Sequence, residues 1–302
     1  MKIVHKRASL LIIMLVFLIT LFGCTKKTSS NIVVENVNPD GKLTITVMDQ
    51  STKKPVSDAK IVIVGADNTY NTNDKGVSPE ISLKINKDIY KKYGDTLLKT
   101  APSGSATIIV FKEGYKDYVY FNKSIYPGNS SNNLKIEISK PVKNDSQKYV
   151  ANIESPHDLW VQELIQYCKN VNQENQGIGE NKVNINVKDS SSKAVEGASI
   201  IIPELGIKTV TDKNGKCTVK LDTLKVEIIV YPVKRQFSDV TIVTLKEGYL
   251  PAISFNTSIN KDKENNINIA LKPGSPDKSG YIVKVEPYEK EWVENLIGNY
   301  KK

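Results

Sequence analysis

Histidine and arginine are nearly absent from this sequence of 302 residues, which contains only His5 and His157, Arg7 and Arg235. With so few histidines, no His-x-x-Glu…His set and no His–Cys zinc set can be built. A Ser-His-Asp triad would have to use His157, which stands at the start of a predicted helix and is expected on the surface. No P-loop or dinucleotide fingerprint occurs. We therefore predict a protein that is not an enzyme, with no catalytic residues, no metal and no cofactor.

The scarcity of arginine also argues against nucleic acid as a partner. The formal net charge is +9, but nearly all of the positive charge is lysine. Proteins that bind nucleic acids use more arginine and cluster it with aromatic side chains. Diffuse lysine charge favours solubility first and contact with an anionic cell-wall polymer second.

Acidic residues are absent before Glu35, and the first 23 residues have the pattern of a secretion signal. A basic cluster at residues 5–7 precedes an apolar run from Ala8 to Phe22. About 15 apolar residues fit a signal core and fall short of the ~20 that span a bilayer as a helix. The run ends in Leu21-Phe22-Gly23-Cys24, which resembles the lipobox of bacterial lipoproteins, although Phe22 is larger than the usual residue at its position.

That resemblance implies cleavage before Cys24 and acylation of its thiol by diacylglycerol and palmitate-type chains. Membrane lipid would then be the partner of Cys24, with the chain anchored on the extracytoplasmic face of the cell membrane; stable anchoring takes more than one acyl chain. The alternative is an uncleaved amino-terminal anchor helix. Removal of residues 1–23, with Lys2, Lys6 and Arg7, leaves 39 basic and 33 acidic residues and a net charge of +6.

Residues 24–40 are polar without an apolar period and are expected to form a flexible tether. Beyond it, Cys168 and Cys217 are the remaining cysteines. They could pair in an oxidising compartment. Because they fall at non-equivalent positions of two repeats, we expect two inert thiols instead.

An internal repeat is the most informative feature of the sequence. Five blocks recur in one order at offsets of 132 to 140 residues: 42–49 with 182–189, 59–64 with 198–202, 73–76 with 211–215, 107–115 with 241–249, and 149–165 with 281–297. Each repeat is long enough to close a core of its own. We predict two tandem domains at 41–169 and 181–302, joined by a polar linker at 170–180.

The fold class predicted for each repeat is a mainly β, antiparallel sandwich with a short carboxyl-terminal helix. Apolar residues alternate with period two, as in Leu43, Ile45 and Val47, which half-buried strands produce. A Trp-containing stripe at helical spacing follows Ser155-Pro156, the expected helix start, and recurs around Trp292. Such helices would cover an open face or edge of a sandwich.

The order of strands and turns resembles the carboxypeptidase regulatory-like domain, a transthyretin-like β-sandwich with seven strands. The resemblance covers about residues 41–140 and 181–272. The residues that carry it are Asp49, Pro55, Val56, Ala59, Asp74, Gly76, Gly114 and Tyr115, and then Asp189, Val195, Gly197, Ala198, Thr211, Asp212, Gly215, Gly248 and Tyr249. Modules of this family accompany peptidases without carrying the zinc site, so the resemblance implies a fold rather than an activity.

Tyrosine, with 14 residues, supplies the candidate binding residues: Tyr90 and Tyr93 in a long connection, and Tyr118 and Tyr120 after the Lys-Glu-Gly-Tyr block. Exposed tyrosines stack on sugars or anchor peptides. We expect a lipid-anchored surface protein that binds or scaffolds cell-envelope material, such as a cell-wall polymer, a glycan or an envelope protein. Two alternatives are a carbohydrate-binding module and an accessory subunit that docks an envelope enzyme or transporter; a carboxylate pair acting as a hydrolase is the third and weakest.

Overall fold

The computed structural model describes residues 40–84, 104–126, 128–221, 237–260, 263–274 and 280–301, which belong to one compact unit, 38–302. The predictions for the signal segment, for Cys24 and its tether, and for Tyr90 and Tyr93 lie outside the described residues.

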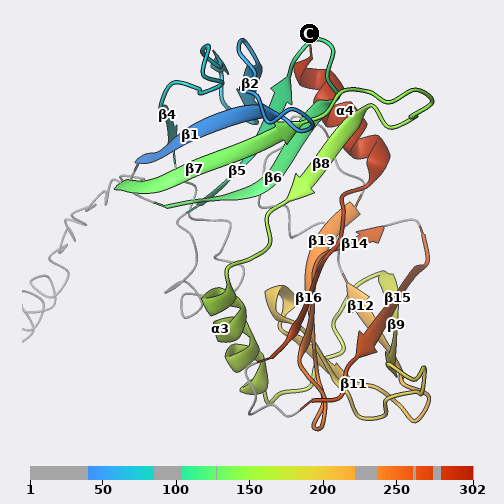
Figure 1. Cartoon of the computed structure of the whole chain (residues 1–302). Helices are drawn as coiled ribbons and strands as arrows, with labels where there is room; N and C mark the ends of the chain where they lie inside the picture. Colours follow the sequence, from blue (N-terminus) through green and yellow to red (C-terminus); the bar gives the residue numbers. More distant parts are fainter. Residues whose placement is uncertain are drawn as a thin grey trace, which may run out of the picture. The chain divides into compact units, whose positions relative to one another are not determined.

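The first repeat forms two sheets whose inner faces share one core (Figure 1). The three-stranded sheet has the order β4 (Ile81–Lys84), β1 (Asp40–Asp49), β7 (Gly128–Ile138). The five-stranded sheet has the order β3 (Thr69–Asn71), β2 (Lys60–Ile63), β5 (Gly104–Phe111), β6 (Asp117–Ile125), β8 (Tyr149–Ile153).

The second repeat has the same two sheets. One is β12 (Lys216–Leu221), β9 (Asn181–Asp189), β15 (Asn265–Leu271). The other is β11 (Ile207–Val210), β10 (Ser199–Ile202), β13 (Phe237–Leu245), β14 (Ala252–Asn260), β16 (Ile282–Val285), and a 3-10 turn, η2 (Pro203–Leu205), joins β10 to β11. The predicted mainly β sandwich fold is confirmed. Most pairs are antiparallel, and β1–β7, β6–β8, β9–β15 and β14–β16 are parallel.

The two kinds of sheet differ in how many of their faces are buried. In β1, Leu43, Ile45 and Val47 are fully buried and alternate with half-exposed residues, as in a sheet with one solvated face. In β5, the consecutive residues 108–110 are all fully buried. Successive side chains of a strand point to opposite faces. The five-stranded sheet is therefore covered on its outer face as well.

The outer cover is a helix that comes from the other repeat. Helix α4 (Lys290–Tyr300), at the end of the second repeat, packs on the first repeat's sheet, whose contacting residues are Val62, Ile109, Phe111, Val119, Phe121 and Tyr149. Helix α3 (Asp158–Lys169), at the end of the first repeat, packs on the second repeat's sheet through Ile201, Val243, Ile253 and Phe255. The two repeats thus exchange their helices. Helix α3 begins two residues later than expected, because His157 rather than Ser155 caps it and accepts the Leu159 amide at Nδ1.

Buried polar contacts repeat between the sandwiches. Thr72 Oγ1 accepts the Ala59 amide at 2.9 Å and donates to the Val56 carbonyl at 2.7 Å, and Thr211 makes the same two contacts in the second repeat. In the turn that follows, Asp212 accepts two backbone amides. The sequence pattern suggested Asp74 as its counterpart in the first repeat. The counterpart is Asn73 instead, since Asn73 Oδ1 accepts the amides of Lys75 and Val77.

Candidate binding site

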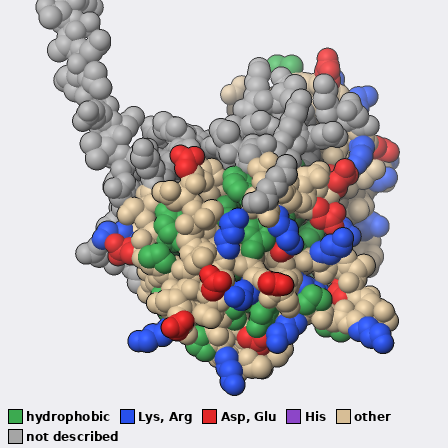
Figure 2. Space-filling view, turned by 90° about the horizontal axis from the view of Figure 1, so that it is seen from above, with side chains coloured by type: hydrophobic (Ala, Val, Ile, Leu, Met, Phe, Trp, Pro, Cys, Tyr) green, Lys and Arg blue, Asp and Glu red, His purple; other side chains and the backbone are tan. Residues whose placement is uncertain are grey.

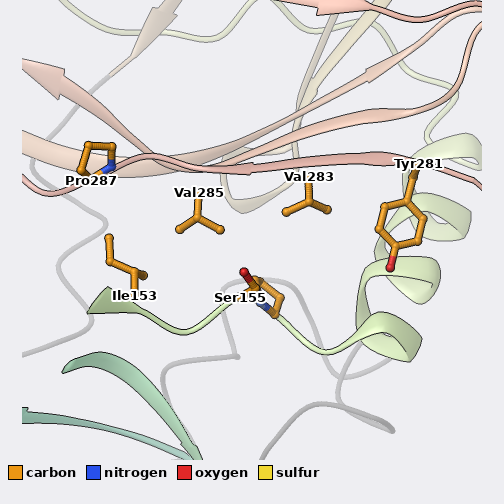
Figure 3. A pocket seen from close by; sticks show the side chains of 7 residues that line it. Ile153, Ser155, Tyr281, Val283, Val285 and Pro287 are labelled. Atoms are coloured by element: carbon orange, nitrogen blue, oxygen red, sulfur yellow. The ribbon is translucent and has the colours of Figure 1, made fainter. Parts of the chain in front are cut away.

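A pocket of about 510 Å³ lies between two segments that lead into the exchanged helices (Figure 3). Ile153, Ser155 and Pro156 come from the connection between β8 and α3. Tyr281 directly precedes β16, Val283 and Val285 belong to it, and Pro287 lies in the connection that follows. Because residues 283 and 285 alternate along one strand, they present one face to the pocket. A volume of 300–1,000 Å³ is usual for sites that hold small ligands or side chains.

Most of the side chains that line the pocket are apolar, although polar atoms, including those of the backbone, form more than half of its exposed surface. The Tyr281 hydroxyl donates to Asp158 Oδ1 at the start of α3. Burial, and then the hydrogen bond to the Asp158 carboxylate, raise the pKa of Tyr281 to about 12, so the phenol stays neutral at physiological pH. The Ser155 hydroxyl is the other polar side chain of the lining. These walls suit an uncharged group that has both an apolar surface and a polar atom.

The expectation that Tyr118 and Tyr120 are exposed is wrong. Tyr118 is 7% exposed and belongs to the first core, and Tyr120 packs against the same core. The Tyr120 hydroxyl donates to Glu154 Oε2 at 3.2 Å, and burial with the nearby Glu154 charge raises the pKa of Tyr120. Both tyrosines lie on β6; Tyr118 is buried and Tyr120 is half-buried against the core.

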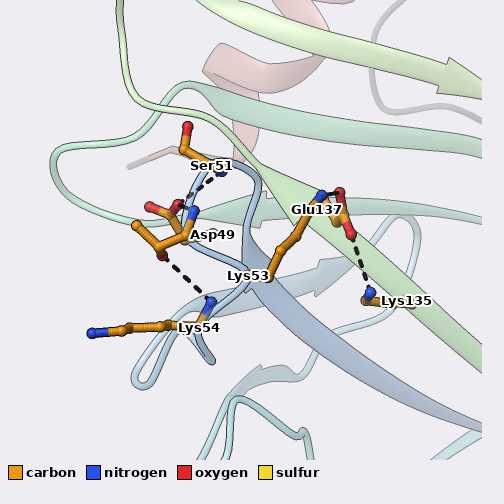
Figure 4. A network of polar contacts seen from close by, with 7 residues as sticks. Asp49, Ser51, Lys53, Lys54, Lys135 and Glu137 are labelled. Atoms are coloured by element: carbon orange, nitrogen blue, oxygen red, sulfur yellow. Dashed lines mark hydrogen bonds and ion pairs between the residues drawn. The ribbon is translucent and has the colours of Figure 1, made fainter.

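Tyr115 has a structural role at the corner of the first sandwich. Its hydroxyl donates to Asp49 Oδ2 at 2.8 Å, while Asp49 Oδ1 accepts the amides of Ser51 and Thr52. These hydrogen bonds, the Thr52 amide first, lower the pKa of Asp49 to about 2. Beside this turn, Lys53 and Lys135 pair with Glu137 at 2.5 and 3.1 Å and lower the pKa of that carboxyl (Figure 4). The network fixes a turn and leaves no free group for chemistry.

The thiols are poorly suited to nucleophilic chemistry. Cys168 and Cys217 are free, as expected, and Cys168 is 1% exposed on the inner face of α3. Burial, with the Glu204 charge second, raises the pKa of Cys168 to about 12, and burial with Asp212 raises that of Cys217 to about 11. The thiolate is the reactive form. Both thiols are therefore unreactive near neutral pH.

Within the described ranges, no group of three or more His, Cys, Asp or Glu side chains is placed to hold a metal ion. His157 is exposed at the amino terminus of α3 and acts as its cap. Among the described helices, none is long and apolar enough to cross a bilayer. On the face seen in Figure 2, the lysine side chains of the described residues are interspersed with aspartate and glutamate rather than gathered into one patch.

Sequence reasoning missed the pocket. Its two walls lie about 130 positions apart in the sequence and meet only because the helices are exchanged. The signal that could have pointed to it is the aligned pair of segments 153–160 and 285–292. They align without a gap and agree at Glu154 and Glu286 and at the two tryptophans, but they differ at the positions between, among them Pro156 and Tyr288.

No family model and no curated protein matches the chain. Solved structures show weak similarity. The Bacillus anthracis TIE protein aligns with 78% of this chain at 13% identity and a TM-score of 0.25, and the match spans about a third (34%) of that protein. A cohesin–X-dockerin complex from Acetivibrio cellulolyticus aligns with 32% of this chain and 59% of its own at 19% identity and a TM-score of 0.23. The shaft pilin SpaA from Lactobacillus rhamnosus GG aligns with 78% of this chain and 98% of its own at 14% identity and a TM-score of 0.21. Similarity at this level carries no argument about function.

Proposed function

We propose that the chain is a non-catalytic, lipid-anchored surface protein whose two carboxypeptidase regulatory-like domains hold a binding pocket for a component of the cell envelope. The membrane anchor rests on residues 1–24, where a basic segment, an apolar core and Gly23-Cys24 follow one another. The family assignment rests on the repeated turn and strand residues.

The observation that carries the binding role is the pocket of about 510 Å³ between Ile153 and β16. Each wall continues into a helix held on the opposite sandwich, by Trp160 on one side and Trp292 on the other. Walls fixed in this way lose little conformational freedom when a ligand enters, which favours affinity. Binding without chemistry agrees with the raised pKa values of both thiols.

A large apolar patch across the two Trp helices would support the accessory-subunit alternative. Trp160 and Trp292 are 4% and 5% exposed, because both indoles pack against sheets. That support is missing, and a docking partner would have to use the pocket instead. The carbohydrate alternative depends on Tyr90 and Tyr93, which lie outside the described residues.

The anchor is tested by cell fractionation of the wild type and of Cys24→Ala in a host that processes lipoproteins, with metabolic labelling by a fatty acid. We expect wild type in the membrane fraction with incorporated label, and Cys24→Ala without label and released from the membrane. Equal labelling of both proteins, or membrane retention of Cys24→Ala, would contradict lipid anchoring through this thiol.

The binding role is tested by capture from a membrane extract on immobilised protein. Ser155→Arg places a long charged side chain at the rim of the pocket, and Ser191→Arg makes the same change in an exposed turn of the second sandwich. We expect one dominant component to bind wild type and Ser191→Arg but not Ser155→Arg. Equal capture by all three proteins would move the binding surface away from this pocket.

A further inference from the structure

The two segments that wall the pocket correspond residue by residue. Ile153 is equivalent to Val285 at the end of each edge strand, and Trp160 is equivalent to Trp292 in each helix, with six residues between them in both cases. Their caps also correspond, since His157 and Glu289 each precede the first helical residue. In this register Tyr288 is equivalent to Pro156.

On the first sandwich, the position shared by Tyr288 and Pro156 is occupied by Tyr288, which packs between two other rings. Its ring lies 4.5 Å from the centroid of Phe121 and 5.3 Å from that of Trp292, and it is 8% exposed. Its hydroxyl bonds to the side-chain amide of Asn122, with Nδ2 3.3 Å away. Asn122 lies in a β-bulge with a positive φ of 59°. The three rings and one amide form a complete tyrosine-binding arrangement within the chain.

On the second sandwich, the arrangement is kept but the tyrosine is missing. Trp160 and Phe255 have their ring centroids 5.4 Å apart with planes at 31°, close to the 5.9 Å and 29° of Trp292 and Phe121. Asn256 occupies the equivalent bulge with a φ of 56°, and its buried Nδ2 has no hydrogen-bond partner. Pro156 stands in place of the tyrosine and lines the pocket. A buried amide without a partner is costly and is uncommon in folded proteins.

We propose that the pocket binds a tyrosine side chain of a partner polypeptide. The phenol ring lies on Val283, Val285 and Pro156, which line the pocket. Its contacts with the Trp160–Phe255 pair and with Asn256 Nδ2 are assigned from the equivalent contacts of Tyr288, because these three residues are not part of the pocket lining. The chain supplies its own precedent, since Tyr288 makes these contacts with Phe121, Trp292 and Asn122.

A polypeptide is favoured as the source of the phenol because β16 borders the pocket and is the last strand of its sheet. The amide of Ile282 donates to the carbonyl of Pro251, next to β14, and the amide of Glu286 donates to the carbonyl of Phe255 in β14. The alternate amides at Val283 and Val285 therefore face the opposite edge of β16. In the described part of the chain, no strand pairs with that edge. Residues next to a bound tyrosine can therefore add backbone hydrogen bonds there.

This inference rests on the proposed binding role of the same pocket, and its test uses purified full-length protein in detergent, without a cell extract. The probes are p-cresol, the side chain of tyrosine, and toluene, which lacks the hydroxyl. NMR titration should show p-cresol binding with a dissociation constant on the order of 1 mM, with shifts centred on Val283, Val285 and the Trp160 indole. Toluene should bind roughly fivefold more weakly, because it leaves the Asn256 amide unpaired.

Three variants test the occupancy of the pocket, the role of the Asn256 amide and the equivalent position on the first sandwich. Pro156→Tyr should fill the pocket, abolish p-cresol binding and raise Tm by about 3 °C. Asn256→Ala should bind p-cresol and toluene equally well. Tyr288→Ala opens the equivalent position on the first sandwich and should gain a second p-cresol site with shifts at Phe121. A tripeptide with a central tyrosine and blocked ends should bind more tightly than p-cresol, and Pro156→Tyr should lose that binding too.

The outcomes separate this inference from the binding role on which it rests. If p-cresol causes no shifts at the pocket, or if toluene binds as well as p-cresol to the wild type, the tyrosine assignment is wrong, even where Ser155→Arg still abolishes capture from an extract. If p-cresol binds as expected but no extract component depends on the pocket, the envelope-binding role is wrong and the phenol site stands. Self-association that Pro156→Tyr removes would make a second copy of this chain the occupant and overturn the assignment to a separate partner.

Discussion

The indole of Trp292 stacks on the phenyl ring of Phe121, with ring centroids 5.9 Å apart and planes at 29°, although the two residues belong to different repeats. Trp160 has the same relationship to Phe255 in the opposite direction along the sequence. Each sandwich is therefore completed by a residue of the other.

Because the helices are exchanged, a mutation in one helix should destabilise the sandwich of the other repeat. Trp292→Ala removes a buried indole and should lower the free energy of unfolding by about 4 kcal/mol. Amide hydrogen exchange should speed up in β6, around Val119 and Phe121, more than in β14. Trp160→Ala is the matched variant and should act on Ile253 and Phe255. If amide hydrogen exchange speeds up only in the repeat that contains the mutated helix, the helices are not exchanged between the repeats.

A second prediction concerns acid stability at the Asp49 corner. Because folding lowers the pKa of Asp49 from 3.8 to about 2, the unfolded chain takes up this proton first as the pH falls. The carboxylate contributes stability above pH 4, and this contribution is lost between about pH 4 and pH 2. Comparison of urea unfolding between pH 2 and 5 should show a shallower loss for Asp49→Asn than for the wild type.

Tyr115→Phe provides the control for this corner. It removes the hydrogen bond to Asp49 Oδ2 but keeps the ring, so an NMR titration of the Asp49 carboxyl should give a pKa closer to 3.8 than in the wild type. An unchanged titration would show that the backbone amides of Ser51 and Thr52 alone set this pKa.

Thiol labelling tests the burial of the two cysteines. In a Cys24→Ala background, iodoacetamide at pH 8 should modify Cys217 slowly and Cys168 more slowly still, since pKa values of about 11 and 12 leave on the order of one thiolate in a thousand or fewer. Both should react quickly in 6 M guanidinium. Fast labelling of Cys168 in the native protein would mean that α3 leaves its sheet readily.

The ends of the two helices offer another matched pair. Lys301 Nζ contacts both carboxylate oxygens of Asp117, at 2.6 and 2.9 Å, and Asp117 is 8% exposed. Because the lysine is largely exposed, Lys301→Ala should cost about 1 kcal/mol rather than the several that a fully buried pair would cost. Lys169 is the equivalent residue of α3, and the second repeat has Pro251 at the position equivalent to Asp117, so Lys169→Ala should change stability by less than about 0.5 kcal/mol. Chemical denaturation of both variants measures the difference.

The sequence predicts the strands and helices that form the layers of this protein, but it does not predict which sheet each helix covers. The period-two pattern of Leu43, Ile45 and Val47 predicted a strand with one buried face, and β1 is such a strand. The apolar stripe around Trp160 predicted a helix that covers a sheet. The stripe cannot tell which sheet, because two sheets of nearly the same sequence offer nearly the same apolar face. The choice depends on the length and path of the connection at residues 154–157, which local patterns do not encode.

The binding residues were harder to predict for the same reason. Tyr118 and Tyr120 follow an exposed turn and suggest surface aromatics, but both side chains face the core between the two sheets, while Val119 and Phe121 on the opposite face of β6 contact helix α4. The two segments differ at several positions, among them Pro156, which lines the pocket, and Tyr288, which packs on the first sandwich instead. The sequence does not show which of these differences matters, because that depends on what Tyr288 contacts in the folded protein.

The reciprocal covering of the sheets also sets an order of events during synthesis. The eight strands described for the first sandwich are complete once Ile153 has been made, yet the helix that covers its outer face ends at Tyr300. At 5–20 residues per second, the ribosome needs on the order of ten seconds more to complete that helix. Throughout this interval Val119 and Phe121 have no cover, so a chaperone that binds apolar sheet surfaces should associate with nascent chains that end between the two repeats.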